Sequence, residues 1–467
     1  MTAPRLAPGG AARPKPGWLH LGPGAFFRAF GLPILQEVGG DWGVIGVSLR
    51  SPATRDALAP QGFAYTALER GPDGPRAAVI EQLRDILVAP EDPRAVLDAM
   101  ADPGIRVVSL TVTEKGYCHD PATGRLNPDH PDIRHDLAAP LPRSAPGFLT
   151  RALAARRAAG HRPFTVLSCD NLPDNGALIR GVVLELARRI DPALADWIAA
   201  EGAFPATMVD RIVPATTPED IAAVARLTGR HDAAPVVHEP FRQWVVTDAF
   251  VDGARPPLER AGVQMVSDVA SFEAMKLRML NGTHSALAYL GSLSGHETIA
   301  EAVAHPVLRA FTRHLWSEIV PTLTPPPGTD LAAYADALLA RYDNAAIRHR
   351  TLQIAMDGSQ KLPQRILGTL RDRLDAGAEA EGLLAVVAAW MRHVGGTDEA
   401  GRPLDLRDPL AEELRARARA ADPVASLLGL RVVFDADLAA RIRAPLTRLH
   451  AELATRGAIT TAERIAR

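Results

Sequence analysis

The sequence predicts an α/β N-terminal domain with a parallel sheet, followed by a predominantly α-helical C-terminal domain. Two features of the first half support the α/β part: short β-branched runs alternate with helical patterns, and a glycine pair, Gly22 and Gly24, follows the first run. Strands separated by helices are typical of a parallel sheet. From about residue 271, runs of Ala, Leu and Arg at helical spacing continue to the end of the chain. We therefore expect two domains, residues 1–270 and 271–467.

The expected elements follow in chain order. Strands are predicted within residues 17–22, 42–50, 105–117 and 164–172, and helices over residues 93–100, 147–160 and 177–190. Residues 208–217 and 235–250 also have strand character. In the second half, residues 272–291 form a helical pattern, and residues 382–394 are apolar nearly all round, which is typical of a buried helix. Residues 1–17 are rich in Pro and Gly, so we expect a loose N-terminal arm.

Composition excludes several classes of protein. The chain has 467 residues, of which 47% are hydrophobic and 23% charged, which fits a globular protein with a substantial core. A net charge of -2 gives no electrostatic reason to expect nucleic acid or an anionic membrane as partner. The two cysteines, Cys118 and Cys169, lack disulfide-framework and metal-ligand spacing. No uncharged apolar run is long enough to span a bilayer. We expect a cytoplasmic protein.

The stretch "LHLGPGAFFRAF" (residues 19–30) carries the glycine pair. A dinucleotide fingerprint has three glycines, G-x-G-x-x-G, and Phe27 stands at the third position. Gly22 would allow the turn after the strand, and Gly24 would let the backbone approach a pyrophosphate. The third glycine serves helix–sheet packing, so a phosphate site can survive the replacement. The pair follows the first strand, which favours a Rossmann-like domain, but a chance pair is the alternative in a chain with 37 glycines.

Polar residues follow two later strands of the predicted sheet. In open parallel sheets, ligands lie beyond the carboxyl ends of the strands. Ordinary turn chemistry is the alternative explanation, because Asp, Asn and Gly are common in loops. The residues concerned are Thr113, Glu114 and Lys115 in "TVTEKGY", and Asp170, Asn171 and Asn175 in "LSCDNLPDNG".

The stretch "FEAMKLRMLNGTHSALAYLG" (residues 272–291) holds the densest polar cluster. On a helix, Glu273, Lys276, Asn281 and His284 project from one side, among leucines. A desolvated lysine has a lowered pKa and can act as a general base. An asparagine amide can donate to a developing alkoxide, and a histidine one turn on could hold the substrate oxygen or orient the lysine. The alternative is a set of satisfied structural groups.

The motifs together resemble the mannitol dehydrogenase family, the polyol-specific long-chain dehydrogenases. The resemblance extends from about residue 18 to residue 365. Its carrying stretches are "LHLGPGAFFRAF", "VTEKGY", "SCDNLPDNG", "MVDRIVPATT", "EPFRQWV" and "KLRMLNGTHSALAYLG". The spacing Lys-x4-Asn-x2-His is specific to that family. The family also has G-x-G-x-F in its cofactor loop, followed by an arginine like Arg28, so Phe27 belongs to the pattern.

The resemblance implies metal-independent hydride transfer between a secondary alcohol and a nicotinamide. It makes Lys276 the general base, with Asn171 and Asn281 as donors to the carbinol oxygen. It makes His284 a ligand of the substrate hydroxyl that also aligns Lys276, and Glu273 the acid that manages proton exit. The residues expected near the cofactor are Gly22, Gly24, Phe27, Arg28, Arg50, Thr113, Glu114, Lys115 and Asp210, the last near the nicotinamide or the polyol.

One later stretch, "RHRTLQIAMDGSQKLPQRIL" (residues 348–367), resembles the fructuronate reductase branch of the family, as does "EPFRQWV". Mannitol dehydrogenases typically carry an arginine where Gln353 stands. A uronate carries a carboxylate, whose recognition requires a guanidinium or an ammonium group. Arg242, Arg350 and Lys361 are the candidates. Arg350 could equally be a surface residue, and Lys361 does not discriminate, because it also matches a lysine of the mannitol enzymes.

The resulting hypothesis is a cytoplasmic NAD-dependent reductase that interconverts D-fructuronate and D-mannonate, as a monomer or weak homo-oligomer. A dehydrogenase that oxidises mannitol or arabinitol is the alternative within the family, and a non-catalytic sugar-acid or nucleotide sensor is the alternative outside it. After the second strand stand Arg50 and Ser51, and the first acid is Asp56. An arginine there could accept a 2′-phosphate, so NAD is expected and NADP is not excluded.

Overall fold

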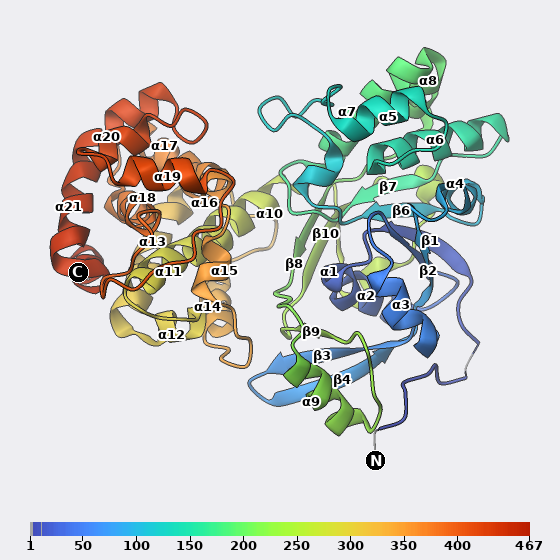
Figure 1. Cartoon of the computed structure of the whole chain (residues 1–467), viewed down its shortest axis with the longest axis horizontal. Coiled ribbons are helices and arrows are strands. Elements are labelled where there is room, and N and C mark those ends of the chain that lie inside the picture. The colour runs from blue at the N-terminus through green and yellow to red at the C-terminus, as the bar shows by residue number, and fades with distance from the viewer. Residues whose placement is uncertain (1–2, 11) are drawn as a thin grey trace. The chain divides into compact units, whose positions relative to one another are not determined.

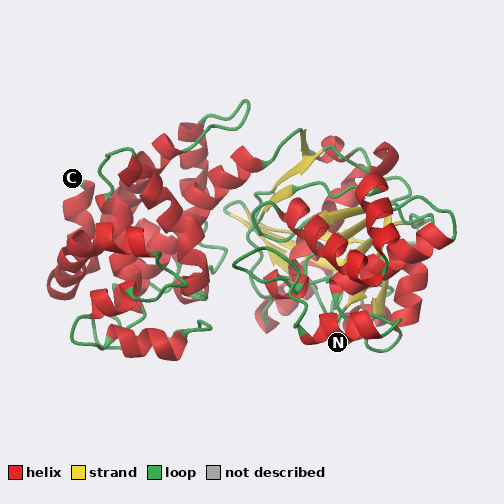
Figure 2. Ribbon diagram, turned by 90° about the horizontal axis from the view of Figure 1, so that it is seen from above, coloured by secondary structure: helices red, strands yellow, loops and turns green. Residues whose placement is uncertain are grey.

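The computed structural model describes residues 3–10 and 12–467 (Figure 1). The chain forms two compact units, Met1–Ala270 and Ser271–Arg467. Figure 2 shows strands only in the first unit, with helices around them, whereas the second unit is drawn in helices and loops. The strands are β1 Pro16–Leu21, β2 Gly43–Ser48, β3 Tyr65–Gly71, β4 Gly74–Ile80, β5 Leu83–Val88, β6 Val107–Leu110, β7 Thr165–Ser168, β8 Thr207–Asp210, β9 Val236–His238, β10 Gln243–Thr247 and β11 Gln264–Val266.

The main sheet of the first unit has the strand order β5-β2-β1-β6-β7, and every neighbouring pair is parallel. The chain thus fills one side of β1 first and then crosses to the other side. This is the strand order of a dinucleotide-binding fold, whose ligand crevice lies where the order reverses, between β1 and β6. The four strands predicted for this sheet are confirmed. The surrounding helices are α1 Ala25–Ala29, α2 Gly31–Val38, α3 Ala53–Leu58, α4 Pro93–Ala101, α5 Pro131–Ala138, α6 Ala145–Ala158, α7 Asn175–Ile190, α8 Pro192–Glu201 and α9 Pro218–Thr228.

Side chains of the main sheet alternate between two hydrophobic clusters. Trp18 and Val107 belong to one cluster, whereas their chain neighbours Leu19 and Val108 belong to the other. Successive strand residues point to opposite faces, so both faces of this sheet are buried. That burial explains why the strands are continuous apolar runs in the sequence.

Two three-stranded sheets complete the unit, with the orders β11-β10-β8 and β4-β3-β9. The sequence did not predict the β3–β4 hairpin, nor β5 of the main sheet. Residues 75–79 of β4 are all exposed, so the strand has no alternation of buried and exposed positions that a sequence pattern could reveal.

The expectation of a loose N-terminal arm is wrong for the described part of residues 1–17. Leu6 is buried, and its amide donates to the carbonyl of His231. The Arg13 guanidinium donates to the carbonyls of Gly62 (2.9 Å) and Leu83. The arm is therefore held along the first unit; residues 1, 2 and 11 lie outside the described chain.

The second unit is a helical assembly around α18. Residues 382–391 of this helix are all buried, as the apolar pattern predicts, and α18 packs against α11, α13 and α21. The helices after residue 281 are α11 Gly282–Leu293, α12 Ile299–Ala304, α13 Pro306–Ile319, α14 Leu331–Tyr342, α15 Thr351–Ala355, α16 Gly358–Leu362, α17 Gly368–Asp375, α18 Glu381–His393, α19 Ala411–Ala418, α20 Pro423–Leu428 and α21 Ala436–Ala466.

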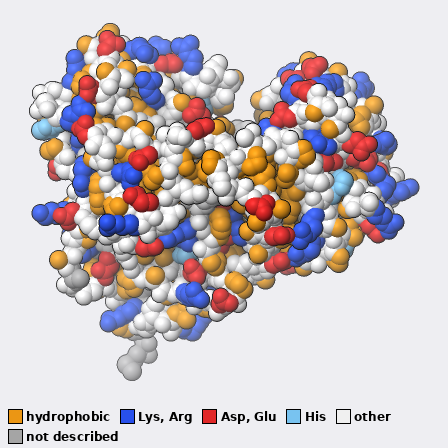
Figure 3. Space-filling model, turned by 180° about the vertical axis from the view of Figure 1, so that it is seen from behind, with side chains coloured by type: hydrophobic (Ala, Val, Ile, Leu, Met, Phe, Trp, Pro, Cys, Tyr) orange, Lys and Arg blue, Asp and Glu red, His pale blue; other side chains and the backbone are white. Residues whose placement is uncertain are grey.

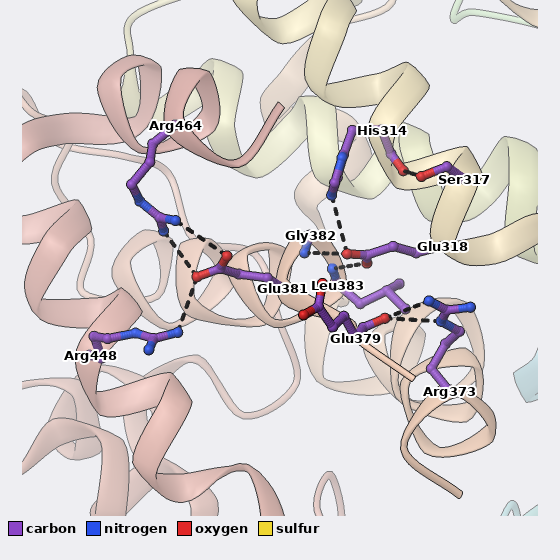
Figure 4. Close-up of polar contacts among 10 residues, drawn as sticks. All are labelled: His314, Ser317, Glu318, Arg373, Glu379, Glu381, Gly382, Leu383, Arg448 and Arg464. Atoms are coloured by element: carbon purple, nitrogen blue, oxygen red, sulfur yellow. Dashed lines mark hydrogen bonds and ion pairs between the residues drawn. The ribbon is translucent and has the colours of Figure 1, made fainter. Parts of the chain in front are cut away.

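Carboxylates fasten the N-terminal end of α18 (Figure 4). The buried Glu318 of α13 accepts hydrogen bonds from the amides of Gly382 and Leu383, both at 2.8 Å. It thereby caps backbone donors that have no partner within the helix. On the other side, Glu381 binds Arg448 and Arg464 of α21, each at 3.1 Å.

The predicted helix over residues 272–291 is interrupted. It consists of α10 Ala270–Met275, the π-helical turn η5 Lys276–Asn281, and α11. A π-helix closes i→i+5 hydrogen bonds, so a wheel drawn for an α-helix does not give the directions of Lys276 and Asn281. A second π-helical turn, η7 Pro363–Leu367, packs against η5. The two approach closely at Gly282, where a Cβ would lie 3.1 Å from the carbonyl oxygen of Arg365.

Within residues 3–10 and 12–467, no helix is both long and apolar enough to cross a membrane. In Figure 3, side chains of both charge signs are interspersed over the visible face. This agrees with the small net charge of the chain.

Candidate active site

A cavity of about 690 Å³ lies at the carboxyl ends of β1, β2 and β6 in the first unit. This is where a doubly wound sheet binds its ligand, and the volume is typical of a cofactor site. Its lining includes Gly22 and Gly24 after β1, Arg50 and Ser51 after β2, Thr111, Val112 and Lys115 after β6, and Arg143 and Ser144 before α6.

Gly22 is required by the backbone of this cavity. Its φ is +85°, and a Cβ would lie 2.3 Å from the carbonyl oxygen of Thr111, which follows β6. The Gly22 amide donates to the Val47 carbonyl (2.9 Å). At Gly24 a Cβ would have no close neighbour, the nearest atom being the Gly22 carbonyl oxygen at 3.9 Å. A glycine at position 24 thus leaves space in the cavity for a ligand.

Phe27 takes over the packing role of the third fingerprint glycine. Its ring stacks on the His20 imidazole of β1, with centroids 3.4 Å apart. On its other side a Cβ at Gly31 would come within 2.3 Å of the same ring. Arg28 is also buried, and its guanidinium donates to the Ala234 carbonyl (2.7 Å). Neither Phe27 nor Arg28 lines the cavity, so their support of the cofactor would be indirect.

The loops after β6 and β7 are joined by Asp170. Its carboxylate accepts from the amides of Val112 (3.0 Å) and Thr113 (2.9 Å) and from the Tyr117 hydroxyl (2.9 Å). Burial raises the pKa of Asp170, and these three bonds oppose that shift. They hold Thr113 at a φ of +63°, which is strained for a residue with a branched side chain. Of the "TEK" residues, Lys115 lines the cavity, whereas Thr113 and Glu114 do not.

Three polar residues of the first unit differ in placement. Asn175 has a structural role, because its amide donates to the carbonyls of Asp170 (3.0 Å) and Thr207 (2.9 Å). Asn171 is exposed just after β7, and Asp210 is buried at the end of β8. The roles predicted for Asn171 and Asp210 remain predictions.

The cavity wall after β2 has no carboxylate. Arg50 and Ser51 line it, whereas Asp56 does not and is engaged by Arg55 at 2.8 Å. Arg143 before α6 adds a second guanidinium to the lining. No motif in the sequence points to Arg143, which lies more than ninety positions after Arg50.

The cavity lining also includes a group that the spacing of the cysteines did not predict. Ligand atoms of Cys118, His130 and Asp132 lie within 4.8 Å of one another. Burial, followed by the nearby carboxylates, raises the pKa of Cys118 to about 12. The sulfur is therefore protonated at neutral pH.

The second unit brings Lys276, Asn281 and His284 into one buried cluster. The three are 7%, 8% and 6% exposed, and they lie at the start of η5, at its end and in the first turn of α11. Among the described residues, Asn281 Nδ2 and His284 Nε2 have no hydrogen-bond partner. Buried polar atoms are nearly always paired in folded proteins. These two are therefore suited to bind oxygen atoms of a ligand.

Positive charge surrounds this cluster. The pKa of His284 is lowered well below its usual value, first by burial and then by the charges of His349, Arg341, Arg365 and Lys276. His284 is thus a neutral imidazole at physiological pH. Its ring lies against Tyr342 (4.7 Å between centroids) and edge-on to His349 (5.1 Å).

The candidates for carboxylate recognition are placed differently from one another. Arg242 binds Glu37 (2.6 Å), and Arg350 is 60% exposed beside Glu297 (3.5 Å), so both already face a carboxylate of the chain. Lys361 is half-buried and donates to the Met356 carbonyl (2.6 Å). Burial, and then the charge of Arg365, lower the pKa of Lys361 to about 8. Glu273, the predicted proton-exit acid, lies half-buried on α10.

A dinucleotide cavity in one unit and a lysine–amide–imidazole cluster in the other define a nicotinamide-dependent dehydrogenase that acts on alcohols. Residues 16–260 match the mannitol dehydrogenase Rossmann domain, and residues 268–447 match the mannitol dehydrogenase C-terminal domain. The chain belongs to the mannitol dehydrogenase family. The predicted class, an NAD-dependent oxidoreductase acting on CH–OH groups, is confirmed.

Named relatives differ in substrate. The chain is 46% identical to the D-mannonate oxidoreductase of Escherichia coli (strain K12) over 455 residues, which cover 94% of this chain and 93% of that protein. It is 44% identical to a mannitol 2-dehydrogenase of Pyrenophora tritici-repentis over 426 residues, 88% of this chain and 75% of that one. The solved ternary complex of Pseudomonas fluorescens mannitol 2-dehydrogenase with NAD and D-mannitol superposes with a TM-score of 0.90 at 38% identity, covering 99% of this chain and 97% of that chain.

Proposed function

We propose that the protein is an NAD-dependent oxidoreductase that interconverts D-fructuronate and D-mannonate. The observation that carries this proposal is the concentration of cationic side chains around His284. Lys276, Arg341 and Arg365 all act on its imidazole, and Arg341, Arg365 and Lys361 act on the neighbouring His349. Positive charge at this place suits an anionic sugar acid better than a neutral polyol. The similarity to a D-mannonate oxidoreductase supports the same choice.

The chemistry proposed for the second unit needs no metal. When bound, NAD supplies the hydride acceptor. Lys276 takes the proton from the alcohol as the carbinol carbon loses hydride, and returns it in the reverse direction. The amide of Asn281 donates to the oxygen as it gains negative charge. His284, held neutral, offers a hydroxyl of the substrate a hydrogen bond, and Asn171 of the first unit is proposed as the second amide donor.

The residues around the first-unit cavity fit a dinucleotide. Gly22 and Gly24 keep side chains away from the turn after β1, and Lys115, Arg50 and Arg143 place cations in the lining. Backbone amides and cations of this kind bind phosphate groups. A cytoplasmic location and a monomeric or weakly associated state remain predictions from the sequence.

Oxidation of a neutral polyol, such as mannitol, to a ketose is the second candidate. It is favoured by the similarity to mannitol 2-dehydrogenases in sequence and in fold. Steady-state reduction of D-fructuronate and of D-fructose with NADH separates the two. We expect kcat/KM to be higher for D-fructuronate. Turnover of D-fructose without turnover of D-fructuronate would overturn the proposal in favour of the polyol dehydrogenase.

A further inference from the structure

We propose that Arg365 binds the carboxylate of the sugar-acid substrate and is the residue by which this site distinguishes a sugar acid from a neutral polyol. The proposal rests on the proposed function and names its specificity-determining residue. It replaces Arg242 and Arg350, whose guanidinium groups face Glu37 and Glu297.

Arg365 lies beside the cluster that holds Lys276 and Asn281. It belongs to the π-helical turn η7, which packs against η5. The absence of a side chain at Gly282 lets the Arg365 backbone come close to the start of α11. From there the Arg365 guanidinium reaches Ser285, the residue after His284, and donates to its hydroxyl at 3.2 Å.

The charge of Arg365 has no anionic partner in the described part of the chain. Its hydrogen bond to the neutral Ser285 hydroxyl leaves most of its five N–H donors for a ligand. By contrast, Arg278 on the adjacent π turn binds Asp372 at 2.6 Å. Arg365 is half-buried, and this burial lowers the pKa of its guanidinium. A desolvated charge without a counter-ion is unfavourable, and a bound carboxylate would remove that penalty.

Buried arginines of the protein donate hydrogen bonds to backbone carbonyl groups. Arg156 donates to the carbonyls of Met100, Asp102, Ile105 and Arg162. Arg211 donates to those of Ala29, Pro240 and Phe241. Arg28 donates to one carbonyl and lies over the Tyr65 ring, 5.4 Å from its centroid. Arg365 differs from all three, because a single hydroxyl is its acceptor.

The groups around Arg365 fit the remainder of a polyhydroxy acid. Asn281 Nδ2, His284 Nε2 and His349 Nδ1 are buried and have no hydrogen-bond partner among the described residues. The two imidazoles lie edge-on with centroids 5.1 Å apart, and Arg365 contacts Ser285, the residue after His284, so all these groups belong to one neighbourhood. A guanidinium can bind a carboxylate through two parallel hydrogen bonds, while amide and imidazole nitrogens bind hydroxyls.

The test compares Arg365→Gln and Arg365→Lys with the wild type, using D-fructuronate and D-fructose as substrates and NADH as cofactor. Removing a charge-assisted bidentate contact should lower kcat/KM for D-fructuronate about 10- to 100-fold, mainly through KM. The value for D-fructose should change less than about threefold, and Arg365→Lys should retain part of the preference for the acid. Arg371→Gln is the control, because Arg371 is a partly exposed arginine of the same unit that is bound to Asp435.

Three further measurements separate a loss of folding from a loss of substrate recognition. NADH binding and the thermal melting temperature show whether Arg365→Gln is folded, and added guanidinium ion should restore D-fructuronate reduction to Arg365→Ala. An unchanged preference for D-fructuronate in folded Arg365→Gln overturns the assignment of Arg365 while leaving the proposed function standing. A wild-type enzyme that reduces D-fructose but not D-fructuronate overturns the proposed function itself.

Discussion

The Phe27 ring lies flat against the His20 imidazole, with the two planes 4° apart. His20 in turn contacts the hydroxyls of Ser109 (2.7 Å) and Thr111 (2.8 Å) on the β6 side of the switch point. Phe27, which stands at the third fingerprint position, therefore supports the two strands between which the cavity opens. A glycine at position 27 would remove that support.

Phe27→Ala should destabilise the protein by about 3–5 kcal/mol, the range for deletion of a fully buried aromatic ring. Chemical denaturation monitored by circular dichroism measures this change. Phe26→Ala is the matched control, since Phe26 is only partly buried on the same helix, and should cost less. If Phe27→Gly leaves stability unchanged and tightens NAD binding, Phe27 has no packing role and a glycine serves better at this position.

Lys276→Ala should lower kcat by about 10²–10⁴-fold, the usual contribution of a positioned general acid–base group. NADH binding, measured by fluorescence, should stay within about twofold, because all the residues that line the dinucleotide cavity precede residue 146. Lys15→Ala, at an exposed position, controls for the loss of a lysine. Full activity of Lys276→Ala across the pH range would refute the assignment of the base.

The preference for a sugar acid should weaken in alkaline solution. Lys361 has a pKa lowered to about 8, first by burial and then by Arg365. A lysine with a lowered pKa is charged below that value and neutral above it, so attraction for an anion is complete below pH 8 and is lost as the pH rises. We expect kcat/KM for D-fructuronate, relative to D-fructose, to fall about five- to tenfold above pH 8, as for the loss of one nearby charge.

The ratio between the two substrates cancels every pH effect that acts on both reactions alike. Lys361→Met should abolish the relative fall above pH 8. If the ratio stays constant with pH in the wild type, Lys361 does not contribute to binding of the carboxylate.

The enzyme should favour NAD but retain measurable turnover with NADP. After β2 the cavity is lined by Arg50 and Ser51, without a carboxylate to repel a 2′-phosphate. Ser51→Asp should reduce the NADP/NAD ratio of kcat/KM at least about tenfold. Asp56→Asn is the control, because Asp56 lies outside the lining and binds Arg55. If the wild-type enzyme shows no turnover with NADP, the inference that the cavity wall after β2 tolerates a 2′-phosphate is wrong.

The sequence predicted the main sheet well because β1, β2, β6 and β7 are buried on both faces and therefore appear as apolar runs. It failed for β4, whose exposed residues carry no alternation. The sequence pattern also predicts one regular α-helix over residues 272–291, because no residue type or spacing indicates the π-helical turn that begins at Lys276.

The candidate site was predicted in part for a similar reason. Lys276, Asn281 and His284 are close in sequence and could be read as a group. Arg365 was contained in the quoted stretch "QKLPQR", yet a guanidinium is recognised as unusual only when its surroundings are known. Arg242 and Arg350 are candidates by residue type and by the family resemblance. Their carboxylate partners, Glu37 and Glu297, are distant in the chain, so the sequence does not show that both arginines are already paired.

The two π-helical turns also limit how this enzyme can be engineered. An α-helix accommodates one residue fewer than a π-helical turn over the same rise. A single deletion between positions 276 and 281 would therefore convert this turn into regular α-helix. The Lys276 ammonium would then rotate relative to the Asn281 carboxamide, while the apolar contacts would stay largely in place. Stabilising substitutions chosen for high helix propensity in this segment favour the same regular geometry. Thermostable variants selected for folding alone should therefore tend to become inactive at this turn, and libraries that spare both π segments should preserve turnover.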